Sequence, residues 1–266
     1  MDLPTSDALD LEFSGGWLTV WFTEPEIRNP LTAARSDGLR ALCAALRDRR
    51  DIRGVTFRGR GGVFCAGGDL KAFKAVFQGG ADRAAVIELS LGGADLFDAV
   101  NSLPQVTVMA VEGAAMAGGF GLACCGDVVV AEASAKFALT ETLIGLTPAQ
   151  ISPFVLSRLG AREGRRLMLT AATLTGEEAR AVGLADEVAT GAGGVDDALA
   201  RLSARVLRAA PGAVAATKAL ILAMPTLDRA AQKRAAAESF ADAMLSDEGR
   251  EGVAAFVQKR KPNWAE

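Results

Sequence analysis

Three short apolar runs in the first half of the chain follow the pattern of β-strands. Trp17–Phe22 is rich in aromatic and β-branched residues and ends at a Thr-Glu-Pro turn. Residues 52–57 and 106–111 are two further strand candidates, and each leads into a glycine-rich segment. Between the first two runs, apolar residues recur at helical spacing from Thr32 onward. The order strand, helix, strand predicts an α/β core.

The second half of the chain is dominated by helical spacing. A helix is predicted over residues 81–100, although Gly92 and Gly93 in its middle should weaken or bend it. Short strand candidates follow at 128–130 and 136–139, and residues 151–261 are predicted to be almost entirely helical. We therefore predict a catalytic core over residues 1–192 and a C-terminal helical region over residues 193–266, with the glycine-rich residues 191–194 as the linker.

Composition narrows the chemistry mainly by what it lacks. The 266 residues contain no histidine and no tyrosine, which excludes a Ser-His-Asp triad, a histidine metal site and a tyrosine proton donor. Acid or base chemistry therefore falls to Asp, Glu, Lys or Cys. The four cysteines have neither disulfide nor zinc-ligand spacing, so we expect buried apolar side chains and no metal site.

Charge and hydropathy exclude two classes of partner. The net charge is −3, and it arises from interspersed charges without a long block of either sign, so nucleic acid is not expected as a partner. The N-terminus has no basic segment followed by an apolar one, and the apolar runs stop short of the roughly 20 residues that a membrane helix needs. We expect a cytoplasmic protein with no membrane partner.

The two glycine-rich segments are the candidate site. Residues 64–70 (FCAGGDL) and 117–121 (AGGFG) each lie between an apolar strand and a stretch that can begin a helix. Glycine has no Cβ, so backbone N–H groups can approach a ligand closely at such turns. Two turns of this kind could hold one oxyanion between them, and the alternative is that their glycines serve only tight turns and close packing.

Several spaced motifs resemble the enoyl-CoA hydratase/isomerase family, also called the crotonase family. The resemblance runs from Arg28 to Pro262, and its most specific parts are the two glycine turns and residues 137–145 and 174–179. It implies an α/β fold, a superhelix of repeated ββα units with C-terminal helices that assemble a homotrimer or a homohexamer. It also implies acyl-CoA thioesters as substrates and no cofactor beyond the CoA of the substrate.

The resemblance also implies roles for residues of the first turn and the start of the second. The thioester oxygen would accept hydrogen bonds from the backbone N–H groups of Gly68 and Gly118, which would stabilise an enolate. Leu70 and Lys71 fall where family members line the CoA site, and Lys71 suits a phosphate as a point charge. Asp69 belongs to the same substrate-binding stretch, although an aspartate at this position is also a good helix cap.

Position 121 departs from the family pattern. Hydratases of this family typically use two glutamates; Glu141 matches the second, and the first falls on Gly121, which lies in the implied substrate-binding stretch. A single carboxylate can take a proton from water and return one to Cα, with its pKa raised by burial, or move a proton between two carbons. The predicted function is therefore enoyl-CoA hydratase, with enoyl-CoA isomerase and a non-catalytic acyl-CoA-binding protein as alternatives.

Other acidic residues and two short stretches refine this hypothesis. Glu88 and Asp95 are candidates for the missing acid, with surface exposure as the alternative, whereas Glu112 and Asp127 are expected to be structural. Residues 118–122 and 146–155 resemble the bacterial subgroup that hydrates 3-methylglutaconyl-CoA and isohexenylglutaconyl-CoA. Glycine at position 121 should also free space for a 3-methyl branch, so a branched substrate is favoured.

Overall fold

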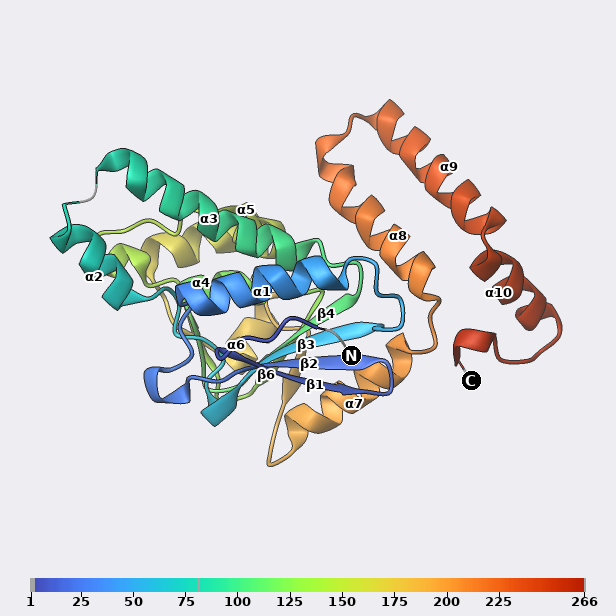
Figure 1. Ribbon diagram of the computed structural model, residues 1–266, viewed down its shortest axis with the longest axis horizontal. Helices are drawn as coiled ribbons and strands as arrows, with labels where there is room; N and C mark the ends of the chain where they lie inside the picture. The colour runs from blue at the N-terminus through green and yellow to red at the C-terminus, as the bar shows by residue number, and fades with distance from the viewer. Residues whose placement is uncertain (1–2, 81, 266) are drawn as a thin grey trace.

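The computed structural model describes residues 3–80 and 82–265, which form two β-sheets covered by helices (Figure 1). The larger sheet has six strands in the order β1-β2-β3-β4-β6-β9. Its strands are β1 (Leu9–Ser14), β2 (Trp17–Phe22), β3 (Gly54–Gly59), β4 (Val106–Val111), β6 (Val128–Glu132) and β9 (Glu187–Ala189). Only the pair β1 and β2 is antiparallel, and the other neighbouring pairs are parallel.

The smaller sheet has three strands in the order β5-β7-β8. β5 (Ala114–Met116) pairs in parallel with β7 (Lys136–Ala138), and β8 (Leu174–Thr175) pairs antiparallel with β7. Parallel strands end at the same edge of a sheet, so the segments that follow β5 and β7 emerge side by side. This edge carries the candidate site.

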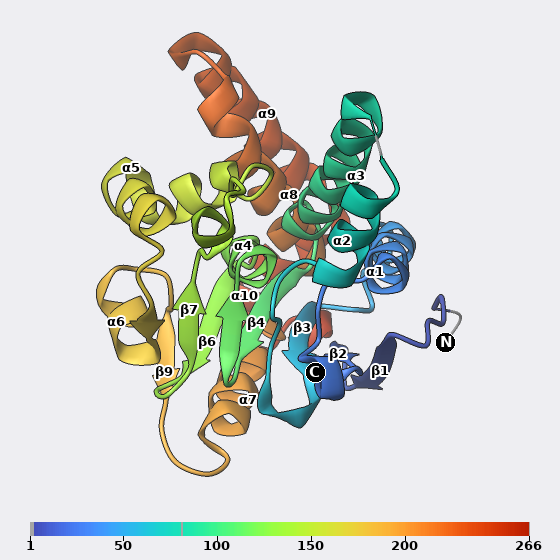
Figure 2. The same cartoon turned by 90° about the vertical axis from the view of Figure 1, so that its left-hand side faces the viewer.

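Helices cover both faces of the six-stranded sheet (Figure 2). The first helices are α1 (Ala33–Leu46), α2 (Leu70–Gln78), α3 (Arg83–Asn101), α4 (Gly118–Cys124), α5 (Ser152–Thr170) and α6 (Gly176–Ala181). α1, α3, α4 and α5 contribute to one large core with side chains such as Leu39, Val100 and Leu167. On the other face, Val195 and Ala198 of α7 (Gly194–Val206) pack against Val108 and Val130.

The last helices form an arm that projects from the core (Figure 1). It consists of α8 (Pro211–Ala223), α9 (Arg229–Leu245) and α10 (Asp247–Val257). Both ends of the arm contact Arg53, just before β3. The Arg53 guanidinium donates to the carbonyls of Leu207, at 3.5 Å, and Ala209, both before α8, and to the carbonyl of Trp264 after α10, at 3.1 Å. The arm therefore leaves and returns to the core at one place.

Most of the predicted elements are confirmed, and several differ. α3 is a continuous helix through Gly92 and Gly93, so the predicted bend is not observed. A Cβ added at either glycine would meet no atom of the described residues within 4 Å. The helix expected from residue 81 begins at Arg83, and residue 81 lies outside the described residues. Residues 151–261 are mainly helical, as predicted, with the short strands β8 and β9 between the helices. The strand β1 was not predicted.

The division expected between residues 192 and 193 stays a prediction. α7, the first helix beyond it, packs on the sheet, and the arm begins only at α8. Within residues 3–80 and 82–265 no single helix is long and apolar enough to cross a membrane. Only when α7 and the segment Pro211–Thr226 are taken together do length and composition suffice for a span, and these two helices are bent by 102° relative to each other.

Candidate active site

The first glycine turn is held between two other segments of the chain. On one side, Leu31 N–H donates to the Gly67 carbonyl at 2.7 Å, and Ala66 N–H donates to the Arg28 carbonyl at 3.0 Å. On the other side, Cys65 forms a parallel β-bridge with Ala115 of β5. The turn is therefore fixed directly beside the strand that leads into the second glycine turn.

The two turns touch through their glycines. A Cβ added to Gly118 would lie 3.7 Å from the Gly68 nitrogen, and one added to Gly67 would lie 3.4 Å from the Gly118 nitrogen. Neither the Gly68 nor the Gly118 N–H donates a hydrogen bond within the described residues. Two unused backbone donors thus lie next to each other, as an oxyanion site requires.

Packing demands some of these glycines more strictly than others. Gly67 has φ +97°, and a Cβ there would lie 2.8 Å from the Met116 carbonyl oxygen; a Cβ on Gly119 would lie 2.4 Å from the Cys65 carbonyl oxygen. At Gly68 and Gly118 the nearest atoms are side-chain tips, Phe73 Cζ at 3.0 Å and Leu31 Cδ1 at 3.2 Å. Close contacts with rigid backbone therefore explain why Gly67 and Gly119 must be glycine. The need for glycine at positions 68 and 118 is less fully explained by packing.

Ala117 is strained where the second turn begins. Its φ is 49° and its ψ is −119°, a region that residues with a Cβ rarely adopt. Its N–H donates to the Ala138 carbonyl of β7 at 2.8 Å, which ties the turn to the neighbouring strand. This bond helps to fix the direction of the chain as it enters α4.

Glu141 follows β7 just as α4 follows β5, so both reach the same edge. It is the first residue of a short 3-10 helix, Glu141–Ile144. Its Oε2 atom is buried and, within the described residues, has no hydrogen-bond partner. Burial raises the pKa of the Glu141 carboxyl above its usual range, since the charged form loses hydration. A partly desolvated carboxyl of this kind is suited to proton transfer.

The three residues after Gly68 lie at the start of α2. Asp69 caps this helix, accepting from the N–H of Lys71 at 2.9 Å and of Ala72 at 3.2 Å, which confirms the capping interpretation. Leu70 is 63% exposed, and Lys71 is also exposed. The exposed side chains of Leu70 and Lys71 are available to a ligand.

The space expected beside Gly121 is filled, so that part of the prediction is wrong. A Cβ added to Gly121 would lie 2.1 Å from Ile151 Cγ2 and 2.5 Å from Ile151 Cβ. Ile151, at the start of α5, is buried. The sequence reasoning missed this residue because the contact joins positions 30 residues apart, and the only sequence signal was its place in the stretch 146–155.

The remaining acidic candidates have structural or surface positions. Glu88 and Asp95 are exposed on α3. Glu112 accepts two hydrogen bonds from Arg58, at 2.6 and 2.9 Å. Asp127 accepts from Lys218 Nζ of α8 at 2.7 Å. Glu112 and Asp127 are therefore structural, as expected.

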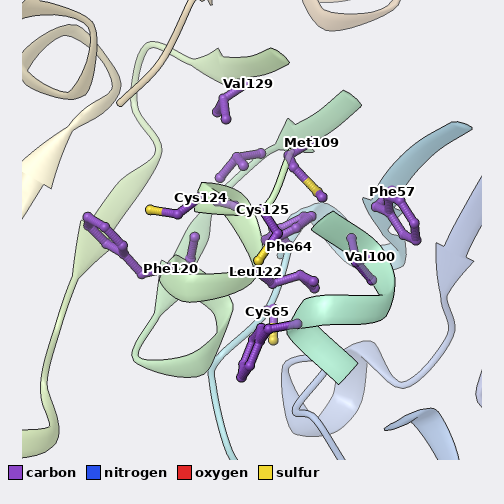
Figure 3. Packing of buried hydrophobic residues seen from close by; sticks show 14 of the residues in the cluster. Phe57, Phe64, Cys65, Val100, Met109, Phe120, Leu122, Cys124, Cys125 and Val129 are labelled. Atoms are coloured by element: carbon purple, nitrogen blue, oxygen red, sulfur yellow. The ribbon is translucent and has the colours of Figure 1, made fainter. Parts of the chain in front are cut away.

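Three of the four cysteines pack in the apolar layer around α4 (Figure 3), and the fourth, Cys43, is buried on α1. Cys124 at the end of α4, its C-cap Cys125 and Cys65 of the first turn are buried among Phe64, Phe120 and other apolar side chains, which confirms the expected apolar role. Burial raises the pKa of the Cys65 thiol to about 11. The described residues contain no group of three or more His, Cys, Asp or Glu that could hold a metal ion.

Comparisons with known proteins identify the family and the fold of the chain. The sequence model of the family "Enoyl-CoA hydratase/isomerase" matches residues 12–266. The structure of Pseudomonas aeruginosa AtuE is 43% identical with a TM-score of 0.94, covering 98% of this chain and 100% of that one. An enoyl-CoA hydratase/isomerase from Marinobacter aquaeolei is 36% identical with a TM-score of 0.92, covering 98% and 100%.

A curated human relative also matches most of the chain. It is named enoyl-CoA hydratase domain-containing protein 2, mitochondrial, and it is 32% identical over 254 residues, which are 94% of this chain and 85% of that protein.

Proposed function

Because the chain belongs to the enoyl-CoA hydratase/isomerase family, we propose that it is an enoyl-CoA hydratase with Glu141 as its only catalytic carboxylate. The observation that carries this proposal is the buried Oε2 of Glu141, which has no hydrogen-bond partner in the described part of the chain. It lies at the edge of the sheet where the Gly68 and Gly118 N–H groups adjoin. The family acts on acyl-CoA thioesters, so the substrate class follows from membership.

The proposed reaction adds one water molecule across the 2,3-double bond. Water oxygen attacks Cβ while Glu141 accepts a water proton, and the electron pair of the double bond moves into the thioester to form an enolate. The enolate oxygen accepts hydrogen bonds from the N–H groups of Gly68 and Gly118, and a well-placed donor of this kind is worth on the order of 3 kcal/mol. As the enolate collapses, Glu141 returns the proton to Cα. The addition is redox-neutral, and in the proposed mechanism every proton transfer and the charge stabilisation are provided by Glu141 and the two backbone N–H groups without a cofactor.

The start of α2 is the proposed CoA-binding element. Leu70 would contact the CoA moiety, and Lys71 would attract a phosphate as a compact charge. Asp69 would contribute by fixing the first turn of α2, since its carboxylate already caps that helix. The proposed location of the protein is the cytoplasm, where its four buried free cysteines would stay reduced.

The proposed assembly is a homotrimer or homohexamer built through the arm. α9 has no buried residue. Six apolar side chains of α9 and α10 are between 62% and 84% exposed: Phe240, Met244, Leu245, Val253, Phe256 and Val257. An apolar surface of this extent is typical of a protein interface.

The branched acyl group stays a proposal with narrower support. Ile151 occupies the position that a side chain of residue 121 would take, so Gly121 gives no support for extra room for a 3-methyl branch. The proposal of a 3-methylglutaconyl-type substrate therefore rests on the resemblance of residues 118–122 and 146–155 alone.

The proposed function is tested by following enoyl absorbance with purified protein. We expect loss of absorbance with 3-methylglutaconyl-CoA or crotonyl-CoA in water. Glu141→Gln should lower kcat by about 10²- to 10⁴-fold, the usual contribution of a positioned acid or base, while acyl-CoA binding survives because the oxyanion site is backbone. Glu88→Gln, an exposed α3 carboxylate, is the matched control and should keep full activity.

Other outcomes of the same assays would contradict the proposal. A gain of conjugated absorbance from a 3-enoyl-CoA, without hydration of any 2-enoyl-CoA, would show an isomerase. Binding without turnover of any of these substrates would show a non-catalytic acyl-CoA-binding protein. An unchanged rate in Glu141→Gln would remove Glu141 from the mechanism.

A further inference from the structure

Gly121 and Ile151 form an unusually close pair beside the candidate site. The three atoms nearest to a Cβ added at position 121 all belong to Ile151: Cγ2 at 2.1 Å, Cβ at 2.5 Å and Cδ1 at 3.4 Å. Real Cβ atoms do not approach other carbons this closely, so any side chain at position 121 requires Ile151 to move.

Ile151 is held in place from both sides. The preceding residue, Gln150, donates from Nε2 to Ser90 Oγ at 2.9 Å. Three residues later, the Phe154 ring lies 6.0 Å from the Phe97 ring, centroid to centroid. Both partners belong to α3, so these contacts tie the backbone around Ile151 to α3. Moving Ile151 Cβ away from Gly121 would therefore require the start of α5 to shift relative to α3.

The pair lies at the same edge as Glu141. Gly121 is on α4, which begins one residue after the end of β5. Glu141 begins the 3-10 helix that follows β7, the parallel neighbour of β5, after Leu139 and Thr140. α5, which Ile151 precedes, packs against both α4 and the 3-10 helix that contains Glu141. One stretch of chain, residues 141–151, thus carries both the carboxylate and Ile151.

We propose that Ile151 occupies the space through which a second carboxylate at position 121 would reach the site, and so determines that Glu141 acts alone. In this proposal Ile151 does not touch the substrate. It acts indirectly, by preventing a larger side chain at position 121. The chemical meaning of this inference rests on the proposed function, whereas its packing part does not.

The packing part is tested by thermal unfolding of single and paired variants. At an open helical position Gly→Ala is stabilising, but Gly121→Ala should lower the Tm by about 3 °C or more, because its Cβ meets Ile151. Ile151→Gly removes both clashing atoms, and glycine is tolerated at a helix N-cap. The double variant G121A/I151G should therefore have a higher Tm than I151G alone.

A matched control separates this pair from general loosening of the core. Val155, also buried, lies one helical turn further along α5. The double variant G121A/V155G should show no such recovery over V155G alone. A Gly121→Ala variant that is more stable than the wild type, or equal recovery with Val155→Gly, would overturn the proposal.

The chemical part is tested by the pKa of Glu141, which needs no turnover. G121E/I151G and its uncharged counterpart G121Q/I151G would be compared by carboxyl ¹³C NMR, with the Glu141 signal assigned by its loss on Glu141→Gln. A second carboxylate facing the same site should raise the pKa of Glu141 further in the Glu variant than in the Gln variant. Equal pKa values would mean that position 121 does not face Glu141 and would overturn the proposal.

Turnover then separates this inference from the proposed function. G121E/I151G should hydrate crotonyl-CoA at least about 10-fold faster than G121Q/I151G. If the wild type hydrates no enoyl-CoA, the proposed function fails, yet the Tm and NMR comparisons still decide whether Ile151 excludes a second carboxylate.

Discussion

At the scale of single residues, Glu141 differs from the structural carboxylates because one of its carboxyl oxygens has no hydrogen-bond partner in the described part of the chain. Structural carboxylates in this protein have partners: Asp69 caps a helix, Glu112 pairs with Arg58, and Asp127 pairs with Lys218. Glu141 is half-buried, and its Oε2 has no hydrogen-bond partner within the described residues. A buried carboxyl oxygen without a hydrogen-bond partner is destabilising when the group is ionised, which is why Glu141 stands out as a candidate for function.

The pH dependence of activity follows from this burial. Desolvation raises the pKa of Glu141, so the carboxyl stays protonated to a higher pH than an ordinary glutamate with a pKa of 4.5. The reaction needs the deprotonated form to accept a water proton. We therefore expect kcat/KM to fall with decreasing pH through a pKa above 4.5, measured as a pH–rate profile. An acid limb at or below 4.5 would contradict the burial of this group.

At the scale of elements, α3 shows how a helix tolerates two adjacent glycines. Its N-cap Asp82 accepts from Ala85 N–H, and Arg40 of α1 donates to the Gly92 carbonyl at 2.7 Å. These bonds involve the cap and the backbone, so they are independent of any side chain at position 92. The two glycines therefore lower the helical propensity of α3, although a Cβ at either position would meet no described atom within 4 Å.

Replacing one of these glycines should stabilise the protein. Gly92→Ala adds a methyl group in open space and restricts the unfolded chain, so the free energy of unfolding should rise by about 0.5–1 kcal/mol. This is measured by urea denaturation. Gly119→Ala is the matched control on α4 and should be destabilising, because its Cβ would lie 2.4 Å from the Cys65 carbonyl oxygen. A destabilising Gly92→Ala would show that α3 needs flexibility there.

At the scale of the whole molecule, the attachment of the arm depends on few polar contacts. Lys218 of α8 is buried, and its Nζ donates to Asp127 at 2.7 Å, to the Gln105 carbonyl at 3.2 Å and to Thr107 Oγ1 at 3.4 Å. These partners lie at or just before the starts of β4 and β6. Lys218 and Arg53 therefore link the arm to the beginning of the parallel strands.

Loss of the Lys218 contacts should weaken the molecule globally. Lys218→Ala leaves the Asp127 carboxylate without its cation, and Asp127 is about one-third exposed, so we expect a loss of roughly 2–3 kcal/mol in the free energy of unfolding. Lys233→Ala, an exposed lysine on α9, is the control and should change stability by less than about 0.5 kcal/mol. Equal effects of the two substitutions would mean that the buried contacts do not anchor the arm.

The apolar face of the arm yields a prediction about assembly. Phe256 is 84% exposed on α10, and a charge at this position would oppose burial against another subunit. We expect Phe256→Glu to shift the protein from trimer or hexamer towards monomer in sedimentation experiments. Glu238→Gln, on the exposed surface of α9, should leave the oligomeric state measured by sedimentation unchanged. A wild-type monomer would contradict the proposed assembly.

Elements and turns that depend on neighbouring residues could be predicted from the sequence, whereas features that depend on tertiary contacts could not. β2 and β4 were predicted with their observed bounds because their apolar runs are bounded by turn residues, and the glycine turns were found because their composition is local. β8 and β9 have only two and three residues, which is too short for a periodic pattern. The filling of the space beside Gly121 could not be predicted, since it depends on a tertiary contact with Ile151.

The close contact between Gly121 and Ile151 also constrains how this protein can evolve. A glutamate at position 121 would first meet an occupied space, and a glycine at position 151 would first leave a cavity. Each single step is disfavoured until the other has occurred, because neighbouring substitutions are not additive. A change from this pair to two carboxylates must therefore pass through a less stable single variant, so a packing contact can preserve a catalytic arrangement independently of selection on activity.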